Sequence, residues 1–160
     1  LGIHGAQDIL TERDVDRFDV VVTAVGTGTT LAGMAIRAAG RLPIIGVSAL
    51  KGVDHATEVT ALLGRTLGDA DWARELLAPV VWWRDAHEGG FGKMTEELQH
   101  FITSFHFEHG ILLDRVYTGK LMLRLQREWQ KPISEQEPLV RQGKRILIIH
   151  TGGTHLAANR

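Results

Sequence analysis

Short apolar runs alternate along the chain with longer segments that have a helical pattern of apolar positions. Four of these runs are almost free of polar residues, which is typical of strands buried on both faces of a parallel sheet. The four runs are Val20–Val25, Ile44–Val47, Val80–Trp83 and Ile146–Ile149. Strands joined through helices by short connections predict an α/β fold, a parallel sheet with flanking helices and right-handed crossovers.

The segments between the strands predict four helices. Two of them follow the first and second strands, at Thr30–Ala39 and Ala56–Leu67. Two more, one near Thr95 and one at Thr118–Trp129, have apolar residues spaced three and four apart, so each should bury one face. These faces comprise Leu98, Phe101, Ile102 and Phe105 in the first and Leu121, Met122, Leu125 and Trp129 in the second.

The composition is that of a globular protein. The chain has 160 residues, of which 44% are hydrophobic and 23% charged, and no internal repeat or linker divides residues 1–160 into separate domains. The net charge is −1 and no run of lysine and arginine forms a basic stripe, which argues against nucleic acid as a partner. The apolar runs are far shorter than a membrane span, so no membrane partner is expected.

The sequence contains no cysteine. Disulfides, thiolate zinc sites and a cysteine nucleophile are therefore excluded, and a reducing, cytoplasmic location is expected. The chain begins Leu1-Gly2-Ile3 rather than with methionine, and no signal pattern follows. This beginning reads like the interior of a longer gene product, and we expect the chain to be a part of one.

A glycine-rich segment, residues 24–33, connects the first expected strand to the helix that follows, and its centre reads Gly26-Thr27-Gly28-Thr29-Thr30. Glycines let the backbone turn sharply and approach a ligand, while free N–H groups at a helix start attract an anion. Threonine hydroxyls add further donors. The segment is therefore a candidate phosphate cradle, and the alternative is a turn that serves only close packing of strand and helix.

Three kinds of phosphate ligand make different demands on such a cradle. A P-loop needs a lysine followed by serine or threonine after its last glycine, and this pair is missing. A dinucleotide site needs glycine where the chain has Leu31 and an acidic residue after the second strand, where it has Ser48 and Ala49. A single phosphate ester such as pyridoxal 5′-phosphate (PLP) needs only amides and hydroxyls, so it ranks first and NAD second.

Three further segments carry a family resemblance. Residues 110–120 read Gly-Ile-Leu-Leu-Asp-Arg-Val-Tyr-Thr-Gly-Lys, residues 149–153 read Ile-His-Thr-Gly-Gly, and residues 89–92 read Gly-Gly-Phe-Gly. They resemble the Gly-Ile-x-Leu-Asp-x-Val-Tyr-Thr-Gly-Lys segment, the terminal His-Thr-Gly-Gly and the Gly-Tyr-Gly turn of the D-cysteine desulfhydrase and 1-aminocyclopropane-1-carboxylate (ACC) deaminase family. The glycine-rich segment lies where that family keeps its phosphate-binding Gly-Ser-Gly-Gly-Thr.

The resemblance implies the C-terminal half of a fold-type II, tryptophan synthase β-like PLP enzyme, often a homodimer, with the cofactor between two domains. Its substrate would be a small amino acid. Carried over by motif, the phosphate would be held by the 26–30 segment, Tyr117 would lie over the substrate side of the ring, and two threonines would lie near the pyridine nitrogen. The residues are Thr27, Gly28, Thr29 and Thr30 at the phosphate, Tyr117 in the catalytic position, and Thr118 and Thr151 at the nitrogen.

Two positions bear on which reaction the resemblance implies. Ring-opening deaminases resemble Tyr-Glu-Gly-Lys where this chain has Thr118, and a hydroxyl leaves the pyridine nitrogen largely neutral. This favours β-elimination of the D-cysteine type, giving pyruvate, sulfide and ammonia. Phe91 stands where the family's Gly-Tyr-Gly turn offers a second hydroxyl, and it can neither donate nor accept a proton. The ring-opening reaction is the alternative.

The family's Schiff-base lysine belongs to a Ser-Gly-Asn-Lys type of motif, which these residues do not contain. Lys120 is nearest to the expected site and is predicted to lie on a helix surface, and Lys51 is predicted to be a solvated loop residue. We therefore expect the isolated chain to be inactive, and its missing partner to be the N-terminal half. A non-catalytic fragment that binds a phosphate ligand or acts through protein contacts is the alternative from another class.

Other chemistry-bearing side chains have simpler interpretations. His106 and His109 are three residues apart, lack the His-Glu-x-x-His spacing of a zinc site and have no third ligand fixed by spacing, so no metal is expected. Trp82 and Trp83 are adjacent in a strand and should face opposite sides, which indicates packing rather than stacking on a base. His150 is expected to pack at a strand end.

Overall fold

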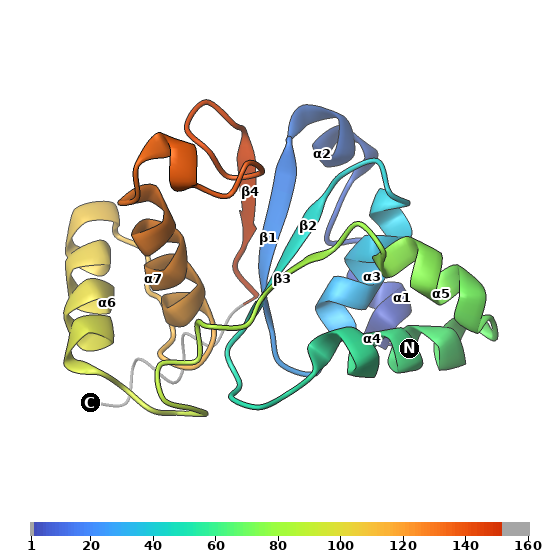
Figure 1. Ribbon diagram of the computed structural model, residues 1–160, viewed down its shortest axis with the longest axis horizontal. Helices are drawn as coiled ribbons and strands as arrows, with labels where there is room; N and C mark the ends of the chain where they lie inside the picture. The colour runs from blue at the N-terminus through green and yellow to red at the C-terminus, as the bar shows by residue number, and fades with distance from the viewer. Residues whose placement is uncertain (1, 152–160) are drawn as a thin grey trace.

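The computed structural model describes residues 2–151 and shows a four-stranded parallel sheet with helices on both faces (Figure 1). The strand order is β3-β2-β1-β4, so the first and last strands of the chain lie side by side. This arrangement confirms the α/β fold class and places each strand within one residue of its expected position. The strands are β1 (Val20–Val25), β2 (Ile44–Ser48), β3 (Val81–Trp83) and β4 (Ile146–Ile149).

The helices form two groups on the two faces of the sheet (Figure 1). On one face lie α1 (Gly2–Gln7), α3 (Thr29–Ala38), α4 (His55–Leu67) and α5 (Ala70–Leu77). On the other lie α6 (Glu96–His109) and α7 (Thr118–Trp129). The short α2 (Glu12–Arg17) precedes β1, and the 3-10 helix η1 (Ile133–Glu135) precedes β4. Helices α1, α2 and α5 were not expected from the sequence.

Each face of the sheet has its own apolar core because successive residues of a strand point to opposite sides. In β1, Val21 and Val25 belong to the core under α3, whereas Val20 and Val22 belong to the core under α7. All four valines are at most 1% exposed. The central strand β1 is therefore buried on both sides, as its continuous apolar sequence predicts.

The two adjacent tryptophans follow the same rule. Trp82 packs on the α3 side, where its ring stacks on that of His55 with 6.5 Å between centroids. Trp83 is buried on the α7 side, with the Arg124 guanidinium 4.4 Å from the centre of its ring. This confirms the expectation that the pair serves packing.

The edge strand β4 differs from the prediction. All four of its residues are half-buried rather than fully buried, because β4 has a neighbour on only one side. It pairs with β1 in register from Val20 opposite Ile146, and the backbone N–H of Arg145 donates to Asp19 Oδ2 at 2.7 Å just ahead of the strands. Hydrogen bonds from the side chain and backbone of Arg145 lower the pKa of Asp19 to about 2.

The expected apolar faces of α6 and α7 are only partly covered. In α6 only Leu98 is buried, since this helix forms the outer layer beyond α7 (Figure 1). In α7 Leu121 and Leu125 pack in the core, while Trp129 is 43% exposed and its Nε1 donates to the carbonyl of Val140 at 2.9 Å. Across the described part of the chain, no helix combines the length and apolar character needed to cross a membrane.

Candidate functional site

The segments that leave the carboxyl ends of the strands gather at one edge of the sheet, at the bottom of Figure 1. The loop after β1 enters α3 there, and α7 begins there as well. In open parallel sheets, ligands bind outside the carboxyl ends of the strands. A ligand site is therefore expected at this edge of the sheet.

The 26–30 loop, Gly26 to Thr30, can be built only with glycine at two positions. Gly28 has a φ of +82° and caps α3, and a Cβ there would lie 2.2 Å from Val59 Cγ2. A Cβ on Gly26 would lie 2.9 Å from Cε1 of Tyr117. The glycines thus allow α4 to pack close on one side and an aromatic ring on the other, while the first N–H groups of α3 stay open toward a ligand.

A cavity of about 230 Å³ lies at this loop. Six of the seven residues expected to form the site line it, and they come from the 26–30 loop, the start of α7 and the end of β4. The lining comprises Ala24, Gly26, Thr27, Gly28, Thr29, Thr30, Leu31, Tyr117 and Thr151. The structure therefore brings together parts of the chain that are more than 120 residues apart in sequence.

The chemistry of the cavity lining is suited to an anion. It contains three hydroxyl residues from the loop, and the Thr27 and Thr29 hydroxyls are 3.2 Å apart. No aspartate or glutamate is among the lining residues. Because the positive end of the α3 dipole and the helix-start amides also face this region, a phosphate group bound there would meet donors without a competing carboxylate.

Tyr117 is held by a carboxylate that the sequence analysis did not single out. Asp114 is 1% exposed, and its Oδ1 accepts hydrogen bonds from the backbone N–H groups of Val116 at 2.8 Å and Tyr117 at 2.7 Å. Its Oδ2 accepts from the N–H of Thr118 at 2.9 Å. An aspartate just ahead of a helix is a capping signal, so this residue was open to detection.

Thr118 is the one expected site residue that does not line the cavity. Its hydroxyl donates to Asp114 Oδ2 at 2.5 Å and accepts from the Asp114 N–H at 3.0 Å. It borders instead a separate apolar hollow of about 190 Å³, together with His150, whose Nε2 lies 2.8 Å from the carbonyl oxygen of Leu112. Its assignment to the pyridine nitrogen stays a prediction. Residues 152 and 153 of the His-Thr-Gly-Gly motif lie outside the described residues.

The expectation that Lys120 lies on a helix surface is wrong. The residue is 1% exposed, and its Nζ donates to the carbonyl oxygens of His87 at 2.7 Å and Gly90 at 2.6 Å. Burial lowers the pKa of Lys120, against the opposing attraction of Glu88 and Asp114. Lys51, in contrast, is exposed in a turn, as predicted.

A second glycine-rich segment supplies the two carbonyl oxygens that accept from Lys120. We call it the 87–92 turn, His87 to Gly92. Four of its residues, listed here with their φ angles, adopt left-handed or related positive-φ backbone: Glu88 at +49°, Gly89 at +89°, Gly90 at +134° and Gly92 at +65°. Phe91 stands at its tip and is 67% exposed.

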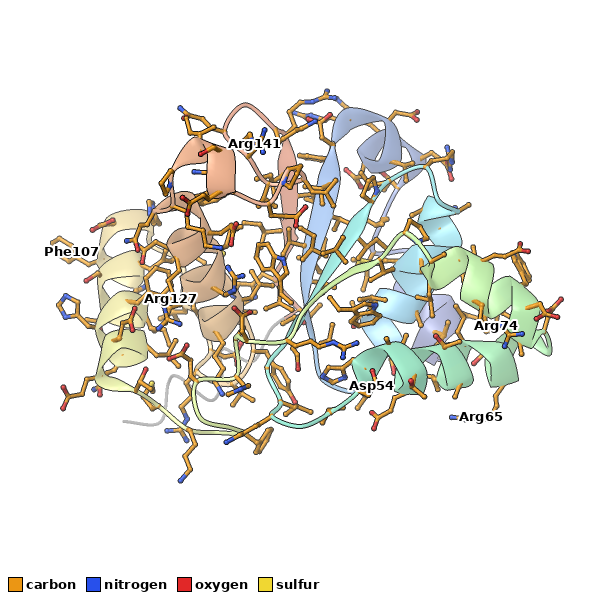
Figure 2. All side chains as sticks on the ribbon, viewed as in Figure 1. Asp54, Arg65, Arg74, Phe107, Arg127 and Arg141 are labelled. Atoms are coloured by element: carbon orange, nitrogen blue, oxygen red, sulfur yellow. The ribbon has the colours of Figure 1, made fainter. Side chains whose placement is uncertain are left out.

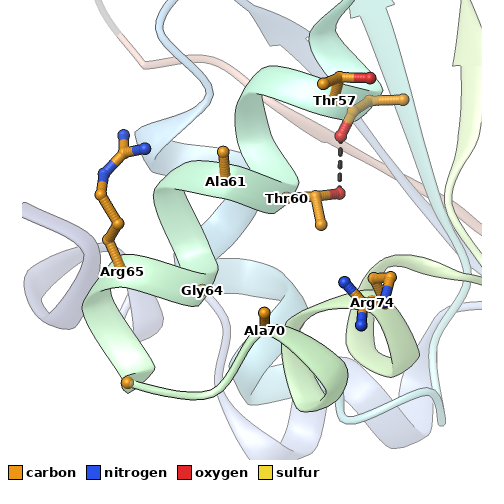
Figure 3. A pocket seen from close by; sticks show the side chains of 9 residues that line it. Thr57, Thr60, Ala61, Gly64, Arg65, Ala70 and Arg74 are labelled. Carbon is orange, nitrogen blue, oxygen red and sulfur yellow. Dashed lines mark hydrogen bonds between the residues drawn. The ribbon is translucent and has the colours of Figure 1, made fainter.

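Other features of the surface do not coincide with the expected site. A hollow of about 810 Å³ lies between α4 and α5, and Figure 3 shows Arg65 and Arg74 on its two sides. No expected site residue lines it. On α6, His106 and His109 are exposed, and Figure 2 shows the neighbouring Phe107 pointing away from α7. Within residues 2–151 no three His, Asp or Glu side chains form a group that could hold a metal ion.

Comparisons with known proteins connect this chain to a family. A protein of Pyrococcus horikoshii named "Putative 1-aminocyclopropane-1-carboxylate deaminase" is 32% identical over 159 residues, which is 94% of this chain and 44% of that protein. The D-cysteine desulfhydrase of Yersinia pestis is 33% identical over 139 residues, which is 85% of this chain and 40% of that enzyme. No family profile matches the chain.

A solved structure gives the same result. The crystal structure of an ACC deaminase homologue superimposes with a TM-score of 0.66 and 29% identity, over 95% of this chain and 44% of that one. The chain spans less than half the length of the relatives it matches. In sequence and in fold, the chain belongs to the ACC deaminase and D-cysteine desulfhydrase family.

Proposed function

We propose that this chain forms the phosphate-binding part of a PLP-dependent active site that acts on a small amino acid. The observation that carries the proposal is the cavity at the start of α3, where Thr27, Thr29 and Thr30 meet Tyr117. A phosphate ester needs hydroxyls, helix-start amides and room for close approach, and the 26–30 loop offers all three.

The chain's own residues would bind and orient the cofactor. The 26–30 loop would hold the phosphate group, and the Tyr117 ring, packed against Gly26, would form a wall of the site with a hydroxyl able to hold or pass a proton. Thr151 lines the cavity, whereas the Thr118 hydroxyl is bonded to Asp114, and this supports Thr151 as the residue that would lie near the pyridine nitrogen. When bound, PLP supplies an electron sink for the bonds at the amino acid's α-carbon.

Among the family's reactions, we propose β-elimination of the D-cysteine type. D-cysteine and water would give pyruvate, sulfide and ammonia. Thr118 supports this choice, because it stands at the sequence position where ring-opening deaminases resemble Tyr-Glu-Gly-Lys, so the motif supplies no carboxylate there. Phe91 argues further against ring opening, since the 87–92 turn carries no hydroxyl at that position. ACC deaminase-like ring opening is the competing proposal.

A complete PLP site requires a Schiff-base lysine from outside these residues. Among the described residues, the lysine nearest in sequence to Tyr117 is Lys120, and its Nζ is already bonded to two carbonyl oxygens. A Schiff-base lysine needs a free, deprotonated amine. We therefore propose that an N-terminal half supplies it, that the assembled protein is a homodimer, and that the chain alone is inactive.

The test is a titration of the purified chain with PLP, followed by visible absorption and by competition with inorganic phosphate. PLP should bind, phosphate should displace it, and Thr29→Val should weaken binding about tenfold, because one hydrogen bond to a charged group is lost. Thr103→Val is the matched control, since the Thr103 hydroxyl donates to Gln99 O on exposed α6.

Two further measurements distinguish the proposal from the competing hypotheses. Borohydride reduction should leave no lysine labelled, and D-cysteine should release no sulfide in the presence of PLP. Equal loss of affinity in Thr29→Val and Thr103→Val, or binding that phosphate does not compete with, would contradict the assigned loop. No binding at all would favour a fragment that acts only through protein contacts.

A further inference from the structure

We infer that Lys120 is a positioning residue, a buried ammonium that fixes the 87–92 turn and so sets where Phe91 stands at the carboxyl edge of the sheet. The inference begins with an unusual burial. Lys120 is among the largest fully buried side chains of the described residues, and a lysine is seldom buried without a reason.

The reason lies in the partners of the ammonium. The carbonyls of His87 and Gly90 belong to one tight turn, in which the Gly90 N–H donates back to the His87 carbonyl at 2.9 Å. The Lys93 N–H donates to the Gly90 carbonyl at 3.2 Å. Lys120 Nζ thus binds the two carbonyls that the turn itself uses as acceptors, and charge-assisted bonds of this kind are stronger than neutral ones.

The turn needs such support because its backbone is strained. Glu88 has a φ of +49°, which non-glycine residues rarely adopt and which persists only where surrounding structure holds it. Its side chain is 7% exposed and forms an ion pair with Arg127, with 2.6 Å between Glu88 Oε1 and Nη1. Figure 2 shows Arg127 between α6 and α7.

Two cations of α7 therefore hold one turn. Lys120 and Arg127 are seven residues apart, so they lie on the same face of the helix, two turns from each other. Lys120 is also one turn after Tyr117, whose ring borders the cavity. The helix that presents Tyr117 thus also holds the backbone next to Phe91, whose side chain is 67% exposed.

This inference rests on the proposed function in one respect: it assigns the 87–92 turn to the side of the site where the amino-acid substrate would bind. Phe91 then presents an apolar ring, without a hydroxyl, to the substrate. The role of Lys120 in fixing the turn depends only on its hydrogen bonds to the His87 and Gly90 carbonyls, and it is tested separately.

The first test uses the unaltered chain. Reductive methylation with formaldehyde, followed by peptide mass spectrometry, should label Lys120 about tenfold or more slowly than Lys93, which is exposed on the adjoining loop. Equal labelling of the two lysines would overturn the inference, whatever any variant does.

The second test compares variants by amide hydrogen exchange. Lys120→Met should speed exchange in the peptide covering residues 88–93 by about tenfold or more, with little change in β1 and α3. Lys120→Arg, which keeps the charge, should restore part of the protection, and Lys93→Met should have no effect. Unchanged exchange in Lys120→Met would overturn the inference, as would a rise spread evenly over the chain.

The third test separates the turn from the phosphate loop. Lys120→Met should leave the affinity for PLP nearly unchanged and weaken the stable adduct N-(5′-phosphopyridoxyl)-D-alanine about tenfold, because only the adduct carries an amino acid. Equal weakening of both ligands would contradict a positioning role. If the unaltered chain binds neither ligand, the proposed function fails, while labelling and exchange still decide the role of Lys120.

Discussion

Two glycine-rich turns leave the sheet at the same edge, and they use their backbone in opposite ways. In the 26–30 loop, helix α3 starts directly after Gly28, so N–H groups face the cavity. In the 87–92 turn, carbonyl oxygens face inward and the ammonium of Lys120 occupies them. The first turn is open to an outside anion, whereas the second is closed by the chain's own cation.

The comparison shows that glycine content alone does not indicate a binding site. Each turn contains glycine with positive φ, Gly28 in the first and Gly89, Gly90 and Gly92 in the second, and both turns follow a strand. The difference lies in whether a helix start or an isolated turn follows, since this decides which backbone groups lack partners. Substitutions that affect one turn and spare the other can therefore test whether the two turns act independently.

The largest effect is expected at Gly28. Gly28→Ala combines a φ of +82° with a Cβ placed 2.2 Å from Val59, so unfolding should become easier by about 3 kcal/mol and PLP binding should be lost. Gly40→Ala is the control, because Gly40 has a φ of +75° but nothing within 4 Å of its added Cβ. Urea unfolding of both variants measures the difference, and equal losses would show that packing against Val59 is unimportant.

The next effect concerns the second support of the closed turn. Arg127→Met leaves the carboxylate of Glu88 buried without its cation and should cost about 2 kcal/mol of unfolding free energy, with faster exchange in the 87–92 turn. Arg84→Met removes an exposed pair with Asp54 and should cost less than about 0.5 kcal/mol. PLP affinity should stay unchanged in both, and a loss in Arg127→Met alone would mean that the turns are coupled.

A smaller effect is expected where α7 connects the two turns. Asp114→Asn replaces one carboxylate oxygen by an amide that cannot accept, so it should cost about 1 kcal/mol and weaken PLP binding several-fold through a misplaced Tyr117. Asp69→Asn serves as the control: the Asp69 carboxylate also accepts from the N–H groups two and three residues later, but it is the N-cap of α5 at an exposed site, where asparagine is an equally good cap. Thermal melts and PLP titration give both quantities, and identical behaviour of the two variants would remove Asp114 from the site.

The smallest effect is a dependence on alkaline pH. Burial lowers the pKa of Lys120 below 10.5, so between the two values the unfolded chain holds more protons than the folded chain. Raising the pH through this window should therefore increase the stability of the wild-type chain relative to Lys120→Met. Urea unfolding of both at pH 7 and pH 10 measures this, and a relative fall in wild-type stability would show that the bonds of the ammonium to the two carbonyls outweigh its desolvation.

The sequence predicts the sheet and most of the cavity because these depend on local patterns. The four strands are short apolar runs, and the 26–30 loop follows β1 directly. Helix α5 was missed although Asp69 caps it and Ala73, Leu76 and Leu77 form an apolar face, because its eight residues are a weak periodic signal.

The surroundings of Lys120 could not be predicted in the same way. The acceptors of its ammonium lie 30 and 33 residues earlier, in a turn whose shape depends on unusual φ angles. A lysine in an amphipathic helix is normally solvent-exposed, so the residue type alone predicted an exposed side chain where the structure has a buried one. Asp114 is an intermediate case, because its hydrogen bonds are to N–H groups nearby in sequence, whereas its burial depends on tertiary packing.

The pairing of β1 with β4 has a consequence for the order of folding. Asp19 and Arg145 are 126 residues apart, so joining these strands closes a far longer loop than joining β1 to β2. Contacts between such distant segments generally form late and slow the search for the native state. Thr151 reaches the cavity only once β4 is in place. The ligand site is therefore expected to mature after most of the sheet has formed, so a nascent chain would hold its 26–30 loop before it holds a complete cavity.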